Sequence, residues 1–267
     1  MAEKRASGGK IGFVPTMGAL HDGHISLLRK AGEDDMFTVC SIFVNPTQFN
    51  DPKDLEKYPV STERDIELLI NAGCNVLFLP EATEIYPPGA DIPTYDFGYL
   101  DTILEGEKRP GHFKGVGQVV SRLLSVVEPD GLYMGQKDYQ QCMVVRRLLE
   151  LTGRQQVRLE ICPTCREADG LAMSSRNSRL SDPQRLLAIA IYQCLVSIQS
   201  KKDSADFAVV QKECIDLLHD KGFETEYVAL ANAQDLQLLN GYSATTPMVA
   251  LIAARIGEIR LIDNMLL

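Results

Sequence analysis

Residues 13–31, FVPTMGALHDGHISLLRKA, decide the fold, because they join a strand to a helix through a turn that contains two histidines. The segment 11–14 is short, apolar and β-branched, which is typical of a buried strand. From Gly23 onward the apolar side chains recur at the spacing of one helix face. His21 and His24 therefore lie one turn apart, on the same side of the new helix's N-terminus.

A helix N-terminus favours an anion, because its first backbone N–H groups have no partner within the helix and the helix dipole is positive there. The glycines at 18 and 23 leave the turn unusually bare around the two imidazoles. The stretch therefore predicts a nucleotide phosphate held by a helix start and two histidines. In the alternative interpretation, a histidine does no more than cap the helix.

The bulk composition limits the kind of protein this can be. The chain has 267 residues, 45% hydrophobic and 24% charged, which suits one large or two modest domains of a soluble enzyme. Its formal charge of −9 argues against an extended nucleic-acid-binding surface. We find no membrane-spanning apolar run and no signal-peptide pattern at the N-terminus, so we expect a cytoplasmic protein.

Seven cysteines lie mostly inside apolar segments, as reduced core cysteines do. One pair, CPTC at 162–165, has the spacing of a redox or zinc motif. With no second pair and no nearby histidine, the zinc interpretation of this motif is weak.

The order of elements predicts the fold class. Strands and helices alternate through the first two thirds of the chain, which indicates an α/β fold with a doubly wound parallel sheet and ligands at the strands' carboxyl ends. The expected strands are 10–14, 36–44, 75–80, 131–135 and 157–162, and the expected helices begin at 23 and span 61–73, 118–127 and 138–151.

The last third of the chain has a different order, with two helical stretches, 182–200 and 203–222, before strands at 225–233 and 248–264. We therefore expect a catalytic domain over residues 1–177 and a smaller α+β domain over 178–267, covering the site. Between strand and helix, residues 80–117 are rich in proline and glycine, as functional loops often are. Within them, Arg109 and GHFKGVG (111–117) indicate a mobile cover or, equally, an ordinary turn.

Polar residues follow three further strands. In FVNPTQFND (43–51), Asn45, Thr47 and Gln48 could hydrogen-bond a hydroxyl or carboxylate in a dry pocket, although an Asn-Pro turn alone would also explain them. This cluster would lie at the same edge of the sheet as the histidine turn.

In YMGQKDYQQ (133–141), Gly135 permits close backbone approach and Lys137 offers a point charge for phosphate. Asp138 could accept from ribose hydroxyls or cap the next helix, and Gln141 shares its face. The fourth cluster, READGLAMSSRNSRL (166–180), places two serines and an arginine, residues 174–176, in a short loop suited to a phosphate.

Together these motifs resemble the pantothenate synthetase (pantoate–β-alanine ligase) family. The resemblance is carried, in order and over nearly the whole chain, by PTMGALHDGH, SIFVNPTQF, RPGHFKGVGQVV, GQKDYQQ, DGLAMSSRN and ARIGEIRLIDN. The wider similarity is to Rossmann-like nucleotidylyltransferases and class I aminoacyl-tRNA synthetases, with HDGH in place of the HIGH signature and AMSSR in place of KMSKS.

The resemblance implies an AMP-forming ligase that joins (R)-pantoate to β-alanine in two steps. The pantoate carboxylate attacks the α-phosphorus of ATP to give pantoyl adenylate and pyrophosphate, and the β-alanine amine then displaces AMP to give pantothenate. The family is usually homodimeric. Mg²⁺ is expected to be bound mainly by the phosphates, with no protein ligand that the sequence identifies.

The resemblance also implies roles for individual residues. His24 is the expected proton donor, with His21, Lys137 and Arg176 as the other catalytic positions. ATP would be bound by Met17, Gly18, His21, Gly23, His24, Gly135, Lys137, Asp138, Cys165, Met173, Ser174, Ser175 and Arg176. Pantoate or β-alanine would be bound by Gln48, Gln141 and Asn45, with Met17 and Phe43 as apolar wall.

The sequence departs from the family pattern near its start, where only residues 1–12 precede the strand that usually follows another strand and helix. We expect either a truncated chain or a missing edge element. The rival functions are a nucleotidylyltransferase with a phosphorylated acceptor, a tRNA synthetase fragment, and a nucleotide sensor without catalysis. Of these, the nucleotidylyltransferase should carry more basic residues around its acceptor. The amides at 45, 48 and 141 favour a small acid as acceptor.

Overall fold

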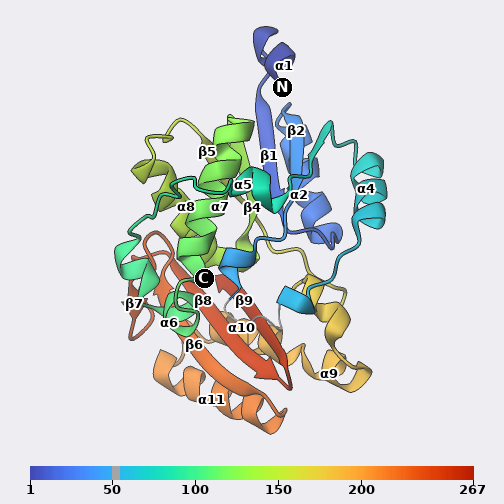
Figure 1. The fold of residues 1–267 in the computed structure, drawn as a ribbon. Coiled ribbons are helices and arrows are strands. Elements are labelled where there is room, and N and C mark those ends of the chain that lie inside the picture. Colours follow the sequence, from blue (N-terminus) through green and yellow to red (C-terminus); the bar gives the residue numbers. More distant parts are fainter. Residues whose placement is uncertain (50–54) are drawn as a thin grey trace. The chain divides into compact units, whose positions relative to one another are not determined.

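The computed structural model describes residues 1–49 and 55–267 (Figure 1), so the last two residues of the predicted 43–51 cluster lie outside the described residues. The chain divides into two compact units. Unit 1 contains Met1–Gln136 and Gln140–Pro163, and unit 2 contains Lys137–Tyr139 and Thr164–Leu267. The longer segment of unit 2 thus begins at Thr164, while the domain boundary after residue 177 stays a prediction.

Unit 1 is built on a parallel five-stranded sheet in the order β3-β2-β1-β4-β5. Its strands are β1 (Ile11–Thr16), β2 (Phe37–Ile42), β3 (Val76–Phe78), β4 (Gly131–Gly135) and β5 (Arg158–Cys162). β1, β2 and β4 are buried almost throughout, as expected where helices cover both faces of a parallel sheet. The predicted α/β fold and its strands are confirmed.

Among the described residues, the helices of unit 1 are α1 (Ala2–Ala6), α2 (Asp22–Glu33), α4 (Thr62–Asn71), α5 (Ala82–Ile85), α6 (Leu104–Lys108), α7 (His112–Val127) and α8 (Tyr139–Leu151), with short 3₁₀ turns η1 (Pro46–Gln48), η2 (Gly98–Asp101) and η3 (Gln136–Asp138). The longer ones form where apolar residues repeat at helical spacing. In α2 the buried residues are the four apolar positions that the sequence identified, 25, 27, 28 and 31. Helix α8 begins at Tyr139, so Asp138 lies in η3.

The segment 111–117 is not the mobile cover that its glycines suggested, because α7 begins at His112 and buries most of these residues. Gly111 takes a left-handed conformation, φ +82°, that allows the chain to enter the helix. Gly115 is needed for close packing, since a Cβ there would lie 2.4 Å from the Thr47 carbonyl oxygen. Glycine is therefore required here for tight packing of a helix, whereas glycine-rich composition alone predicts a loop.

Unit 2 contains an antiparallel sheet in the order β7-β6-β8-β9, formed by β6 (Glu224–Asn232), β7 (Leu238–Leu239), β8 (Met248–Ile256) and β9 (Ile259–Leu266). Its helices are α9 (Asp182–Leu187), α10 (Ala190–Ser200) and α11 (Phe207–Asp220), with the 3₁₀ turn η4 (Ser175–Arg179) before them. The predicted helix over 182–200 is therefore two helices.

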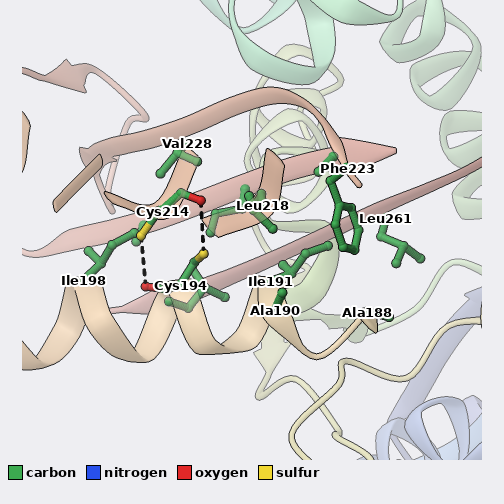
Figure 2. Packing of buried hydrophobic residues seen from close by; sticks show 14 of the residues in the cluster. Ala188, Ala190, Ile191, Cys194, Ile198, Cys214, Leu218, Phe223, Val228 and Leu261 are labelled. Atoms are coloured by element: carbon green, nitrogen blue, oxygen red, sulfur yellow. Dashed lines mark hydrogen bonds between the residues drawn. The ribbon is translucent and has the colours of Figure 1, made fainter. Parts of the chain in front are cut away.

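The core of unit 2 packs α10 and α11 against β6, β8 and β9 (Figure 2). At its centre Cys194 and Cys214 each direct a thiol to the other's backbone carbonyl oxygen at 3.6 Å. All seven cysteines are free thiols. In the CPTC pair, burial raises the pKa of the Cys162 thiol to about 11, which keeps that sulfur protonated and a poor nucleophile.

No helix among the described residues is long and apolar enough to cross a membrane.

Candidate active site

The conformation of the turn after β1 is fixed by a carboxylate from α4. Gly18 and Ala19 both have positive φ, +79° and +49°, so the chain reverses sharply before the histidines. Asp65, 1% exposed, accepts from the backbone N–H groups of Ala19 and Leu20 at 2.8 Å each. Ser61 donates to the same carboxylate at 3.0 Å. The strained turn is thus fixed by a buried charge that sequence reasoning did not select.

The two histidines form a capping box at the start of α2. The Gly23 N–H donates to His21 Nδ1 at 3.1 Å, and the His21 N–H donates to His24 Nδ1 at 3.3 Å. Because both Nδ1 atoms accept, each neutral ring carries its proton on Nε2. His21 therefore caps the helix, and the two bonds of the capping box use only the Nδ1 atoms of the rings.

Asn45 is the centre of a polar cluster that follows β2. It is 1% exposed and caps η1, so the Asn-Pro turn interpretation is confirmed. Its Nδ2 donates to Gln48 Oε1 and to the Gly115 carbonyl oxygen, both at 3.2 Å. Its Oδ1 accepts from Tyr86 Oη at 2.8 Å. These bonds use both ends of the Asn45 amide to hold its neighbours.

Gln48 is oriented from both its side chain and its backbone. Its Nε2 lies 2.7 Å from Met17 Sδ, which brings together two residues predicted to contact pantoate. Its carbonyl oxygen accepts from Arg109 at 3.3 Å and from Nδ1 of the buried His112 at 2.8 Å. The position of Gln48 therefore depends on the first turn of α7 and the arginine before it.

The remaining predicted residues of unit 1 surround this edge of the sheet. Phe43 is buried after β2, with its ring centroid 6.3 Å from that of Tyr86. Gly135 ends β4, where a Cβ would have no neighbour within 4 Å, so the backbone is open to close approach. Gln141 is half-buried on α8. The neighbouring Gln140 is structural, since its amide bonds the backbone at Leu100, Ile103 and Glu105.

Unit 2 contains the predicted cationic residues. Lys137 Nζ lies 3.4 Å from Asp138 Oδ1, and the Lys137 side chain is 17% exposed. Residues 165–173 form a tight hairpin, in which the Met173 N–H donates to the Cys165 carbonyl oxygen at 3.0 Å. Gly170, φ +96°, reverses the chain against the Tyr192 ring, where a Cβ would lie 2.2 Å from a ring carbon.

The serine and arginine cluster follows this hairpin and opens η4. Ser174 is the N-cap, and its Oγ accepts from the Arg176 N–H at 3.3 Å. Asn177 Nδ2 donates to the Ala172 carbonyl oxygen at 3.0 Å and ties the cluster to the hairpin. Ser174, Ser175 and Arg176 are all half-buried. The local geometry is that of a capped turn that offers backbone N–H groups, hydroxyls and a guanidinium.

The structure thus brings the predicted residues together in two sets. Unit 1 contains Met17, Gly18, His21, Gly23, His24, Phe43, Asn45, Gln48, Gly135 and Gln141, and unit 2 contains Lys137, Asp138, Cys165, Met173, Ser174, Ser175 and Arg176. Sequence reasoning missed Asp65, Tyr86 and His112, which hold the first set. Tyr86 and His112 lie in the proline- and glycine-rich stretch 80–117, but only their tertiary contacts single out these side chains.

A parallel sheet with a histidine-capped helix at a strand's carboxyl end, and a serine–arginine turn elsewhere in the chain, defines an α/β protein of the nucleotide-binding class. The family model described as pantoate-beta-alanine ligase matches residues 1–266. The chain belongs to this family.

Two curated pantothenate synthetases match this chain over nearly their whole length. The pantothenate synthetase of Cytophaga hutchinsonii is 43% identical over 270 residues, covering 100% of this chain and 95% of that protein. That of Dehalococcoides mccartyi is 43% identical over 262 residues, covering 97% and 96%.

Solved structures share the fold. Pantothenate synthetase from Thermus thermophilus superposes with a TM-score of 0.90 at 40% identity, over 99% of this chain and 96% of that one. Pantoate–β-alanine ligase from Francisella tularensis, solved in complex with β-γ ATP and β-alanine, gives a TM-score of 0.81 at 38% identity, over 97% and 90%. The chain is an ATP-dependent ligase that forms the amide bond between pantoate and β-alanine.

Proposed function

We propose that this chain forms pantothenate through a pantoyl-adenylate intermediate, using the residues of the two sets described above. In the first step a pantoate carboxylate oxygen bonds to the α-phosphorus of ATP and pyrophosphate leaves. In the second the β-alanine amine bonds to the acyl carbon, loses a proton, and AMP leaves. Such transfers depend on positioning and charge neutralisation more than on protein nucleophiles.

The observation that carries the proposal is the capping box of His21 and His24. Both rings accept through Nδ1, so the Nε2–H groups are the ring donors that would meet a phosphate at the start of α2. His24 is proposed to stabilise the charge that develops on the phosphate oxygens and to supply a proton to the leaving group. His21, Gly18 and Gly23 line the same helix start.

Gln48 and Gln141 are proposed to bind pantoate, with Met17 and Phe43 against its dimethyl group. The Met17–Gln48 contact supports this pairing, because it places an amide beside an apolar thioether. Asn45 is proposed to act on pantoate chiefly through Gln48, since both ends of its amide are bonded within the protein.

In unit 2, Lys137, Ser174, Ser175 and Arg176 are proposed to bind the triphosphate, with Lys137 and Arg176 neutralising the departing pyrophosphate. Asp138 and Gly135 are proposed to meet the ribose. The backbone of Cys165 and Met173, fixed by their mutual hydrogen bond, is proposed to contact adenine.

Mg²⁺ is the metal that the proposed reaction implies. Within residues 1–49 and 55–267, no group of three or more His, Cys, Asp or Glu side chains could hold a metal ion. Two of the proposed phosphate ligands, Lys137 and Arg176, are cations, which do not coordinate Mg²⁺. The residues therefore do not fit a protein-bound magnesium site, and the ion would be held by the phosphates of ATP.

A homodimer and a cytoplasmic location stay predictions, as does the absence of nucleic-acid partners, which rests on the formal charge of −9.

The test is release of pyrophosphate from ATP, Mg²⁺ and D-pantoate, measured with and without β-alanine. We expect little turnover without β-alanine, because the adenylate stays bound, and steady turnover with it. Release with a phosphorylated acceptor in place of pantoate would favour the nucleotidylyltransferase alternative. No release under any condition, together with ATP binding, would favour the nucleotide sensor.

A further inference from the structure

Strand β9 contains two adjacent buried polar residues that the proposed mechanism does not use. Asp263 is 4% exposed and Asn264 is 1% exposed, within the ARIGEIRLIDN motif at the end of the chain. Successive residues of a strand point to opposite faces of the sheet. The two side chains therefore reach different parts of unit 2, and each one bonds to a segment that contains proposed ATP ligands.

Asp263 holds the hairpin of residues 165–173 through Arg166. The guanidinium donates to both carboxylate oxygens, at 2.6 and 3.1 Å, and also to the carbonyl oxygens of Gly170 and Asn264, at 3.0 and 3.2 Å. It stacks on the Tyr192 ring at 4.7 Å from the centroid. A bidentate pair such as Arg166–Asp263 fixes the direction of the guanidinium as well as its distance. The hairpin is therefore held at its base by this pair and at its turn by the bond from Arg166 to the Gly170 carbonyl oxygen.

Asn264 holds Lys137 through the backbone. Its Nδ2 donates to the Lys137 carbonyl oxygen at 2.8 Å, although the two residues lie 127 positions apart in the chain. Lys137 lies in η3, a turn of only three residues. Such a short turn has few internal bonds, so a buried amide that bonds its carbonyl restricts where the lysine side chain begins.

We propose that Asn264 is a positioning residue, which sets Lys137 in the geometry that binds ATP, while Asp263 fixes the 165–173 hairpin through Arg166. Asn264 acts through the segment it holds. The inference rests on the proposed function for the identity of the nucleotide, and it concerns geometry within unit 2 alone.

The test uses Asn264→Leu, which has a similar volume but no donor, and Asn264→Asp, whose carboxylate cannot donate to the carbonyl. The matched control is Gln211→Met, because Gln211 Nε2 also donates to a backbone carbonyl oxygen in unit 2, that of Val228 at 2.6 Å. Lys137→Met is made alone and combined with Asn264→Leu. The readouts are pyrophosphate release, KM for ATP and for pantoate, and ATP affinity by calorimetry.

We expect Asn264→Leu and Asn264→Asp to weaken ATP affinity on the order of tenfold, the scale of one well-placed charged contact. KM for pantoate and the melting temperature should change no more than in Gln211→Met. In the Lys137→Met background, Asn264→Leu should have little further effect, because the residue it positions is gone.

Wild-type ATP affinity in both Asn264 variants would overturn the proposal. So would an equal loss in the presence and absence of the Lys137 side chain, which would indicate general destabilisation. If the wild-type protein binds ATP but releases no pyrophosphate, the proposed function fails by itself. The ATP affinities of the wild type, Asn264→Leu, Lys137→Met and the double variant still decide whether Asn264 positions Lys137.

Discussion

The histidine turn of unit 1 and the lysine and serine–arginine segments of unit 2 present similar donors in different ways. In unit 1 the two imidazoles are held by backbone N–H groups within three residues of themselves. In unit 2 Lys137 and the hairpin are held by side chains of β9, more than 90 positions along the chain. The two imidazoles are fixed by local bonds, and Lys137 and the hairpin are fixed by long-range contacts.

This difference has an energetic consequence. A capping box forms as soon as its helix starts, so the histidines are placed by the same bonds that stabilise α2. The geometry of Lys137 requires β9 to be folded and in register, because a one-residue slip would exchange Asp263 and Asn264 between faces. Unit 2 should therefore be the part in which distant substitutions disturb nucleotide binding.

The largest expected effect is on catalysis at His24. His24→Ala removes the Nε2–H donor and should lower the rate of adenylate formation on the order of 10²–10³-fold while ATP still binds. Pre-steady-state pyrophosphate release and calorimetric ATP affinity measure the two quantities.

The matched variant is His24→Asn, whose Oδ1 replaces Nδ1 as acceptor for the His21 N–H. It should lose activity to the same degree yet keep the melting temperature that His24→Ala lowers. Near-normal turnover in either variant would contradict the role of the helix start.

The second effect is on the turn that precedes the histidines. Asp65→Asn replaces one of the two accepting carboxylate oxygens by an NH₂ donor. This donor would face the backbone N–H of Ala19 or of Leu20, so the substitution should cost about 2–3 kcal/mol of stability. Chemical denaturation measures the loss. Glu67→Gln, on the exposed face of the same helix, is the control and should change stability by less than about 0.5 kcal/mol. Equal denaturation midpoints for the two variants would show that Asp65 does not stabilise the turn.

The contrast between local and long-range contacts also explains which parts of the structure the sequence predicts. The strands of the parallel sheet, the histidine turn and the serine–arginine cluster were all predicted, because periodicity and capping act over a few residues. The contacts made by Asp65, His112 and Asp263 were not, since each of these side chains bonds to a residue at least 45 positions away along the chain, which no local pattern shows. The segment around Gly115 was predicted to be a cover or a turn, because the sequence does not show the tertiary contact between Gly115 and η1.

A third effect, of similar size, separates backbone strain from side-chain packing in unit 2. Gly170→Ala adds a Cβ at positive φ and against Tyr192, and should cost about 2–3 kcal/mol and raise KM for ATP. Gly222→Ala also has positive φ, +79°, but meets no atom within 4 Å, so it should cost only about 1 kcal/mol. Melting temperatures of the two variants measure the difference. If they are equal, the hairpin is not pressed against Tyr192.

The smallest effect concerns acid, in which two hydrogen-bonded carboxylates should respond in opposite directions. In unit 1, hydrogen bonds from Lys30, Tyr133 and Arg158 lower the pKa of Asp34. In unit 2, burial raises the pKa of Asp263 in spite of the Arg166 pair. A lowered folded-state pKa gives stability that is present above the unfolded value of about 3.9 and is lost as pH falls below it.

Asp263, with a raised pKa, has the opposite sign: its contribution to stability falls as pH rises through the folded value. Acidification from about pH 6 to about pH 3 should therefore lower the stability that Asp34 contributes and should not lower the stability that Asp263 contributes. Urea midpoints measured across this range should fall for the wild type and fall less for Asp34→Asn, whose amide does not titrate. If both proteins show the same slope, Asp34 is not the group that links acid to stability in unit 1, and the contrast between the two carboxylates is wrong.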